Sequence, residues 1–291
     1  MFRFCRSGFH TESTFNMNYW EARTALKDVG KGRNHPFRAR CERWNSETLE
    51  TETGDFLVKA PRDRVIEARD FFYEIVGLRL ARLFDVPTAR GAIILLEDDF
   101  IDDLKDTELG KHEFEAGLGV GCEFIKGLSP LTARTAFREE WLGPARLLYA
   151  FDLLMRHDDR GVANPNCGVK NKGLLAYDFE RCFQGLEQPA WQVSDQDFVA
   201  RHIFHRHLMK KPDEKMVPPD VWDEFLERLD ECDDARLKGQ LHDLPPLWNT
   251  PTRQAHLLRH FAEARREKHK LRNELDKCLL KPLPAPRGET P

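Results

Sequence analysis

Residues 157–164 read HDDRGVAN, and residues 178–180 further along the chain read DFE; these two motifs are the most informative about the fold. The first stretch is polar and shows no apolar periodicity, so it is expected to be a loop. Between the two, Asn171-Lys172-Gly173 predicts a tight hairpin, because Asn and Gly tolerate positive φ. The antiparallel strands of such a hairpin are expected to bring Asp178 back beside Asn164.

These side chains suit phosphoryl transfer from ATP. Asp159 and Asn164 match the pattern H-x-D-x-x-x-x-N, in which the Asp is the base and the Asn a metal ligand. Asp178, followed by Phe, takes the place of the D-F-G aspartate that ligates Mg²⁺. A single D-x-x-x-x-N could equally close turns and cap helices. The ordered set of apolar helix, loop, hairpin and Asp-Phe favours the catalytic interpretation.

Two upstream residues complete the pattern. Phe56-Leu57-Val58-Lys59 has the form of the strand whose lysine holds the α- and β-phosphates. Glu74 lies in the middle of an apolar helical stretch, where an unpaired acid is costly to bury, so Lys59 is the expected partner. Lys59 could instead be a solubilising residue of an edge strand, and Glu74 a solvent-facing acid that pairs with Arg79 or Lys59.

The pattern around these residues predicts the N-terminal architecture. Alternating apolar and charged residues over 37–44 and 55–59 indicate an antiparallel sheet with one wet face. A helix is expected to open at Pro61 and Asp63 and to run towards Pro87, before a strand over 89–96 and a charged loop. Residues 119–125 follow, and Cys122, Glu123, Phe124 and Ile125 are the candidates for a connector between lobes that contacts adenine. That these residues are simply another strand is an equally open interpretation.

The rest of the chain is expected to be helical. An apolar stripe ending near Arg156 follows Gly143-Pro144, and further helices are predicted over 195–208, from Asp220, and from Thr250-Pro251 towards Cys278. Three histidines fall in the first of these later helices, at positions 202, 205 and 207, but no Cys or acid joins them at zinc-site spacing, so a metal role is disfavoured.

Composition narrows the class of protein. The 291 residues carry 45 Lys and Arg against 49 Asp and Glu, a net charge of -4, which disfavours a protein that coats nucleic acid. No window approaches the roughly 20 apolar residues of a membrane-spanning helix. No secretory signal is recognised at the start, and the seven cysteines stand singly, so a cytoplasmic location with reduced thiols is expected.

The motifs together resemble the HipA-like kinase domain family over about residues 30–183. The residues that carry the resemblance are Phe56-Leu57-Val58-Lys59, Glu74 with Leu83-Phe84-Asp85-Val86-Pro87, Gly121-Cys122-Glu123-Phe124-Ile125, and Asp159-Arg160 with Asn164-Pro165-Asn166. The resemblance implies a two-lobed fold similar to protein and phosphoinositide kinases, with ATP and Mg²⁺ in the cleft. It implies that Asp159 is the base and that Asn164 and Asp178 are metal ligands. It also implies that Lys59 binds phosphate and that Glu74 is its partner.

The expected fold is therefore α+β and protein kinase-like. It has an antiparallel-sheet N-lobe over 20–125, a mainly helical C-lobe over 126–280 and a disordered tail over 281–291. The expected activity is transfer of the γ-phosphate of ATP to a hydroxyl, with a protein serine or threonine as acceptor.

Departures from the pattern leave alternatives open. No G-x-G-x-x-G precedes Lys59, and residues 30–34 are the nearest candidate for covering the phosphates. Glu180 replaces the Gly of D-F-G, a feature shared with aminoglycoside phosphotransferases, so a small-molecule acceptor is the rival interpretation. A nucleotide-binding pseudokinase that regulates a partner is the other.

Overall fold

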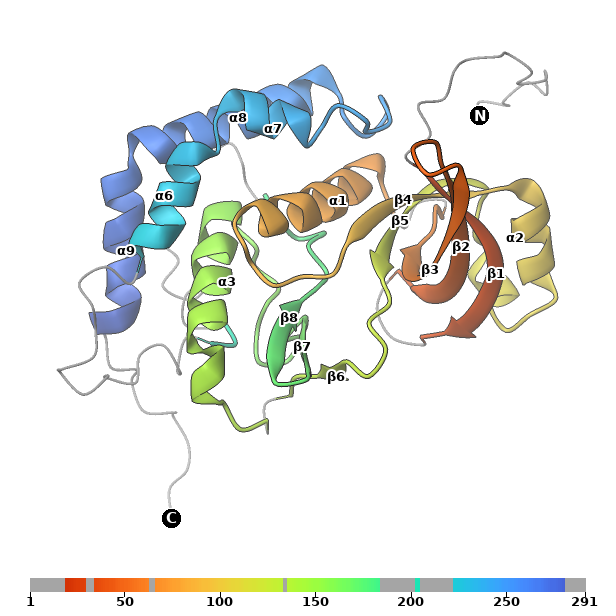
Figure 1. Cartoon of the computed structure of the whole chain (residues 1–291), viewed down its shortest axis with the longest axis horizontal. Coiled ribbons are helices and arrows are strands. Elements are labelled where there is room, and N and C mark those ends of the chain that lie inside the picture. Colours follow the sequence, from red (N-terminus) through yellow and green to blue (C-terminus); the bar gives the residue numbers. More distant parts are fainter. Residues whose placement is uncertain are drawn as a thin grey trace.

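The N-terminal part of the chain is a closed five-stranded barrel. The computed structural model describes residues 19–29, 34–62, 66–132, 135–183, 202–204 and 222–280. The strands follow the order β1-β2-β3-β5-β4 around the barrel. Their bounds are β1 Trp20–Asp28, β2 Phe37–Asn45, β3 Glu50–Lys59, β4 Gly91–Leu96 and β5 Gly117–Glu123 (Figure 1). All neighbouring strands are antiparallel except β1 and β4, whose short parallel pairing closes the barrel.

Alternation along β2 and β3 produces the barrel core. Phe37, Ala39 and Cys41 on β2 are buried, and so are Phe56 and Val58 on β3, because successive side chains of a strand point to opposite faces. The antiparallel sheet expected from the sequence is confirmed. Its closure is new, since no motif in the sequence indicated a parallel contact between β1 and β4.

Helix α1, Ala68–Leu83, lies between the barrel and the C-terminal helices (Figure 1). It begins later than the opening expected at Pro61 and Asp63, of which Asp63 lies outside the described residues. The side chain of Asp70 accepts a hydrogen bond of 3.0 Å from the Glu67 N–H, so the helix is capped at Glu67. Its apolar face packs into the C-terminal core, which positions Glu74 beside β3.

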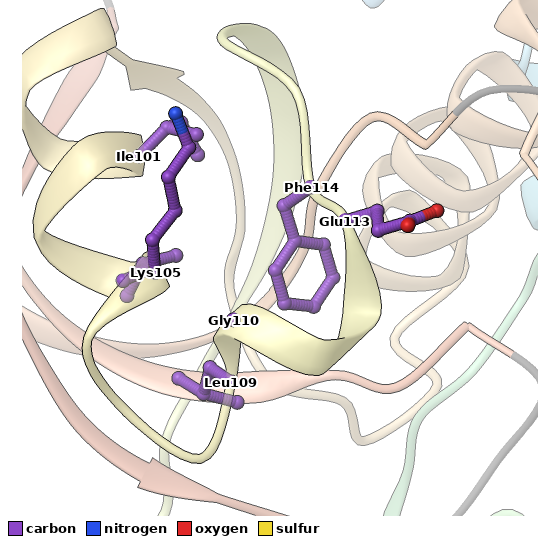
Figure 2. A pocket seen from close by; sticks show the side chains of 7 residues that line it. Ile101, Lys105, Leu109, Gly110, Glu113 and Phe114 are labelled. Carbon is purple, nitrogen blue, oxygen red and sulfur yellow. The ribbon is translucent and has the colours of Figure 1, made fainter.

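The charged segment between β4 and β5 is not the loop expected from the sequence. It holds α2, Asp98–Lys105, and the short 3-10 helix η1, Gly110–His112. Phe100, Ile101 and Leu104 are buried against the barrel, whereas the acids of α2 face solvent. A pocket of about 360 Å³ lies between α2 and η1, lined by side chains that include Leu109 and Phe114 (Figure 2).

The C-terminal part is helical around a small sheet, as expected. It contains η2 Glu139–Trp141, α3 Leu142–Met155, β6 Ser129–Pro130, β7 Cys167–Lys170, β8 Gly173–Ala176, α6 Asp223–Glu231, α7 Asp234–Gly239, α8 Pro251–Arg266 and α9 Lys268–Leu280. The expected last helix is divided at Glu267 into α8 and α9. None of the helices in the described ranges is both long enough and apolar enough to cross a bilayer.

The predicted hairpin is present as β7 and β8. Its turn residues are Asn171 and Lys172, with φ of 49° and 69°, and Gly173 already belongs to β8. The helix expected over 195–208 lies outside the described residues apart from 202–204. The start expected at Asp220 and the tail 281–291 also lie outside them, and the described part of that later helix begins at Asp223.

Candidate functional site

One lysine gathers three carboxylates where the barrel meets the helices. Lys59 ends β3, and its Nζ donates to Glu74 Oε2 at 3.0 Å and to Asp178 Oδ1 at 2.7 Å. It also donates to Glu180 Oε2 at 3.0 Å. The structure thus brings together Lys59, Glu74 and Asp178, which the sequence placed in one site from positions up to 119 residues apart.

Glu74 is almost completely buried, at 2% exposed. Its Oε2 also accepts a 2.9 Å hydrogen bond from the Phe179 N–H, so α1 is tied to the segment that carries Asp178. Burial raises the pKa of Glu74, Lys59 lowers it, and Asp178 and Glu180 raise it. The net result is a pKa of about 7. Burial lowers the pKa of Lys59, yet the carboxylates outweigh burial and leave it raised.

This balance predicts a pH-dependent stability difference between the wild type and Glu74→Gln. The folded-state pKa of Glu74, about 7, exceeds its ordinary value of 4.5. The contribution of Glu74 to the unfolding free energy is therefore fully present below pH 4.5 and is lost as the pH rises through about 7. Relative to wild type, Glu74→Gln should gain on the order of 1 kcal/mol in unfolding free energy between pH 6 and pH 8.

Urea unfolding of the metal-free proteins at the two pH values measures this difference. The buried histidines have lowered pKa values, so their contribution to stability changes with pH in the opposite direction over this range. This contribution is common to the wild type and Glu74→Gln and cancels in the difference between them. A difference between the two proteins that does not change with pH would contradict the assignment.

Glu180 is a member of the cluster that sequence reasoning did not place there. Its carboxylate accepts from Lys59 and from Asn34 Nδ2, and Asn34 is buried just before β2. The signal in the sequence was that Glu180 stands where the D-F-G motif has glycine. Asn34 ends the segment expected to cover the phosphates, while residues 30–33 lie outside the described residues.

Asp159 is held by two amides. Its Oδ2 accepts from Asn164 Nδ2 at 2.6 Å and from Asn166 Nδ2 at 3.3 Å. Asn164 is exposed, whereas Asn166 is buried and directly precedes β7. The Asn166 carbonyl accepts from the Tyr177 N–H at 3.0 Å, so Asn166 lies next to the residue that precedes Asp178. Sequence reasoning missed Asn166, although Asn-Pro-Asn before the strand was the signal.

Asn166 and Asp178 share an unusual backbone conformation. Their φ values of 46° and 61° lie in the left-handed region, which Asn and Asp tolerate better than other residues with a Cβ atom. His157, which is buried, donates from Nε2 to the Asp178 carbonyl at 2.9 Å. Such conformations gather at functional sites when neighbouring contacts enforce them, as these contacts do here.

The expected connector begins at the end of β5. Cys122 and Glu123 are the last residues of that strand, and Phe124 and Ile125 follow it. The N–H groups of Glu123 and Phe124 are bonded within the protein, to Arg90 O at 2.8 Å and Asp55 O at 2.7 Å. Burial raises the pKa of the Cys122 thiol. An adenine contact by these residues stays a prediction, and it cannot use those two N–H groups while their present bonds remain.

The fold belongs to the α+β class, with an N-terminal sheet followed by helices. The structure is similar to that of the proinflammatory kinase CtkA from Helicobacter pylori, with a TM-score of 0.49 and 11% sequence identity over 86% of this chain and 94% of that one. No protein-family model matches the sequence, and no curated protein does.

Proposed function

We propose that this protein is an ATP- and Mg²⁺-dependent phosphotransferase of the HipA-like kinase type, acting on a protein serine or threonine hydroxyl. The observation that carries the proposal is the convergence of Lys59, Glu74 and Asp178. Phosphoryl transfer requires a cation for the phosphates and oxygen ligands for the metal, together with a base for the acceptor hydroxyl. This chain has side chains suited to each of these tasks.

The donor set fits Mg²⁺, which prefers oxygen ligands. Oxygens of Glu74, Asp178 and Glu180 all lie within 4.8 Å of one another. Although burial raises the pKa of Asp178, Lys59 keeps it below its ordinary value, so the carboxylate is ionised at neutral pH. We assign Asp178 and Glu180 as ligands, with the amide oxygen of Asn166 preferred to that of Asn164, because Asn166 is buried next to the β7–β8 hairpin. When bound, Mg²⁺ supplies positive charge to the β- and γ-phosphates.

The protein groups then have separate tasks. When ATP binds, Lys59 contacts the phosphates in place of the carboxylates of Asp178 and Glu180, while its hydrogen bond to Glu74 remains. Asp159 accepts the proton of the acceptor hydroxyl through Oδ1, because Oδ2 is occupied by the two amides. The same amide bonds leave the oxygens of Asn164 and Asn166 as the atoms that can ligate a metal.

A calorimetric titration of ATP with and without Mg²⁺ tests the proposal. The wild-type protein should bind ATP more tightly with Mg²⁺, and Asp178→Asn should remove that enhancement because it lowers the charge of the metal site. Asp243→Asn is the matched control: this acid pairs with Arg79, at 2.6 Å, away from the Lys59 cluster. Equal affinity with and without Mg²⁺ in the wild type would refute the proposed metal site.

The pseudokinase alternative is separated by the same titration and a transfer assay. ATP binding that needs no Mg²⁺, together with an absence of phosphotransfer to any substrate, would favour it. A small-molecule kinase is distinguished by the chemical class of the labelled product, since Glu180 after Asp178 fits either acceptor.

A further inference from the structure

A buried arginine joins the two candidate metal-binding segments. Arg160 directly follows Asp159 and is 1% exposed. Its Nη1 donates to the Asn166 carbonyl at 2.5 Å and to the Tyr177 carbonyl at 3.1 Å. Asn166 ends the loop before β7, and Tyr177 immediately precedes Asp178. One nitrogen atom therefore bridges the backbone of both segments.

Two further side chains hold this arginine. Arg160 Nε donates to Asp152 Oδ2 at 2.6 Å, and Asp152, on α3, is completely buried. The same oxygen accepts from His202 Nε2 at 2.9 Å. His202 Nδ1 accepts from the Phe204 N–H at 3.2 Å, which fixes the neutral tautomer with its proton on Nε2.

The segment 202–204 also contacts the arginine backbone. The Ile203 N–H donates to the Arg160 carbonyl at 3.0 Å, and His202 forms an isolated bridge with Gly161. On its other side, the Arg160 guanidinium lies 4.9 Å from the centre of the Phe179 ring. The orientation of the guanidinium is thus determined by α3, by segment 202–204 and by the residue after Asp178.

The energetics favour a positioning role over a purely stabilising one. Exchanging a buried ion pair for well-packed apolar residues is often neutral or stabilising, so a buried pair is weak evidence for stability. The planar guanidinium group of arginine carries several N–H donors in a fixed arrangement, so it can position acceptors in a way that an apolar side chain cannot. Here Nε of that group donates to Asp152, and Nη1 donates to the carbonyls of Asn166 and of Tyr177, the residue before Asp178.

We propose that Asp152, Arg160 and His202 form a positioning cluster that sets the separation between the Asn166 amide and the Asp178 carboxylate. His202 orients Asp152, Asp152 orients Arg160, and Arg160 holds the carbonyls of Asn166 and Tyr177. The proposal rests on the proposed function, because it concerns the geometry of the same metal site. It gives His202 a role that does not involve metal ligation.

The test is the Mg²⁺ affinity of the ATP-loaded protein, measured by calorimetry. His202→Ala should weaken Mg²⁺ binding by about tenfold, the lower end of the effect seen when partners of metal ligands are removed. ATP affinity without Mg²⁺ should be unchanged. His202→Gln should restore Mg²⁺ affinity, because its Nε2 can still donate to Asp152.

A matched control separates positioning from general destabilisation. His260 is also a buried histidine of the C-terminal part, and its Nε2 contacts the Leu154 carbonyl at 2.8 Å, away from the cluster. His260→Ala should lower the unfolding free energy without changing Mg²⁺ affinity. If His202→Ala does not fold, His202→Phe keeps the ring volume, removes both nitrogens and should show the same loss.

Each outcome decides between the proposals. An unchanged Mg²⁺ affinity in the folded His202 variants, or an equal loss in His260→Ala, would overturn the positioning cluster while the proposed function stands. A wild-type protein that binds no Mg²⁺ with ATP would overturn both.

Discussion

Asp159→Asn should lower the turnover number for phosphotransfer by about 10² to 10⁴, the range that a positioned general base contributes. Asn has nearly the same shape and can occupy the same position near Asn164 and Asn166, but it cannot take the proton of the acceptor hydroxyl. ATP affinity should persist, because Lys59 and Asp178 are unchanged. Steady-state kinetics together with ATP titration separates the two effects.

The adjacent acid provides the matched control. Asp158 forms a two-bond ion pair with Arg181, at 3.0 and 2.8 Å, and both side chains are exposed. Exposed pairs contribute about 0–1 kcal/mol to stability, so Asp158→Asn should leave the fold intact, and turnover should fall far less because Asp159 is unchanged. Equal losses in the two variants would show that the loop as a whole, and not the base at Asp159, determines the rate.

Lys59→Met should both abolish phosphate binding and destabilise the fold. Lys59 is the cation shared by Glu74, Asp178 and Glu180, and its side chain is only 14% exposed. Removing one partner of a buried ion pair leaves charge uncompensated and costs about 3–5 kcal/mol. Urea unfolding should show a loss of this size, and no ATP binding should be detectable.

The loss should shrink when the negative charge is reduced. In the double variant Lys59→Met/Glu74→Gln the cluster carries one charge less, so the double variant should be more stable than Lys59→Met alone. A Lys59→Met protein that is as stable as wild type and binds ATP normally would contradict the central place of this lysine.

Local periodicity explains why much of the fold could be predicted. The alternation over 37–44 requires a strand with one buried face, and the apolar spacing around Glu74 requires a helix. An acid in the middle of a buried helical face needs a partner, and the lysine of the kinase motif pattern made Lys59 the expected one, with Arg79 as the alternative left open. The hairpin was predictable because Asn171 can adopt a positive φ in a tight turn.

The remaining features depend on contacts that no local pattern records. The parallel pairing of β1 and β4 joins segments about seventy residues apart, and a helix in the acidic segment after β4 is stabilised by burial against the barrel. Counting five residues from Asp159 selects Asn164, but the loop continues for two residues before β7 begins, so the buried amide is that of Asn166. Arg160 is equally hard to predict, because its partners Asp152 and His202 come from different elements.

Transfer of label from γ-labelled ATP is the direct test of phosphotransfer that depends on Asp159. Wild-type protein and Asp159→Asn would be incubated with labelled ATP and Mg²⁺, alone and with cell lysate, and the labelled products identified by mass spectrometry. Wild-type protein should produce phosphoserine or phosphothreonine on a protein, and Asp159→Asn almost none. A labelled metabolite would move the acceptor to the small-molecule class, and an absence of Asp159-dependent labelling of any product would contradict the proposed phosphotransfer.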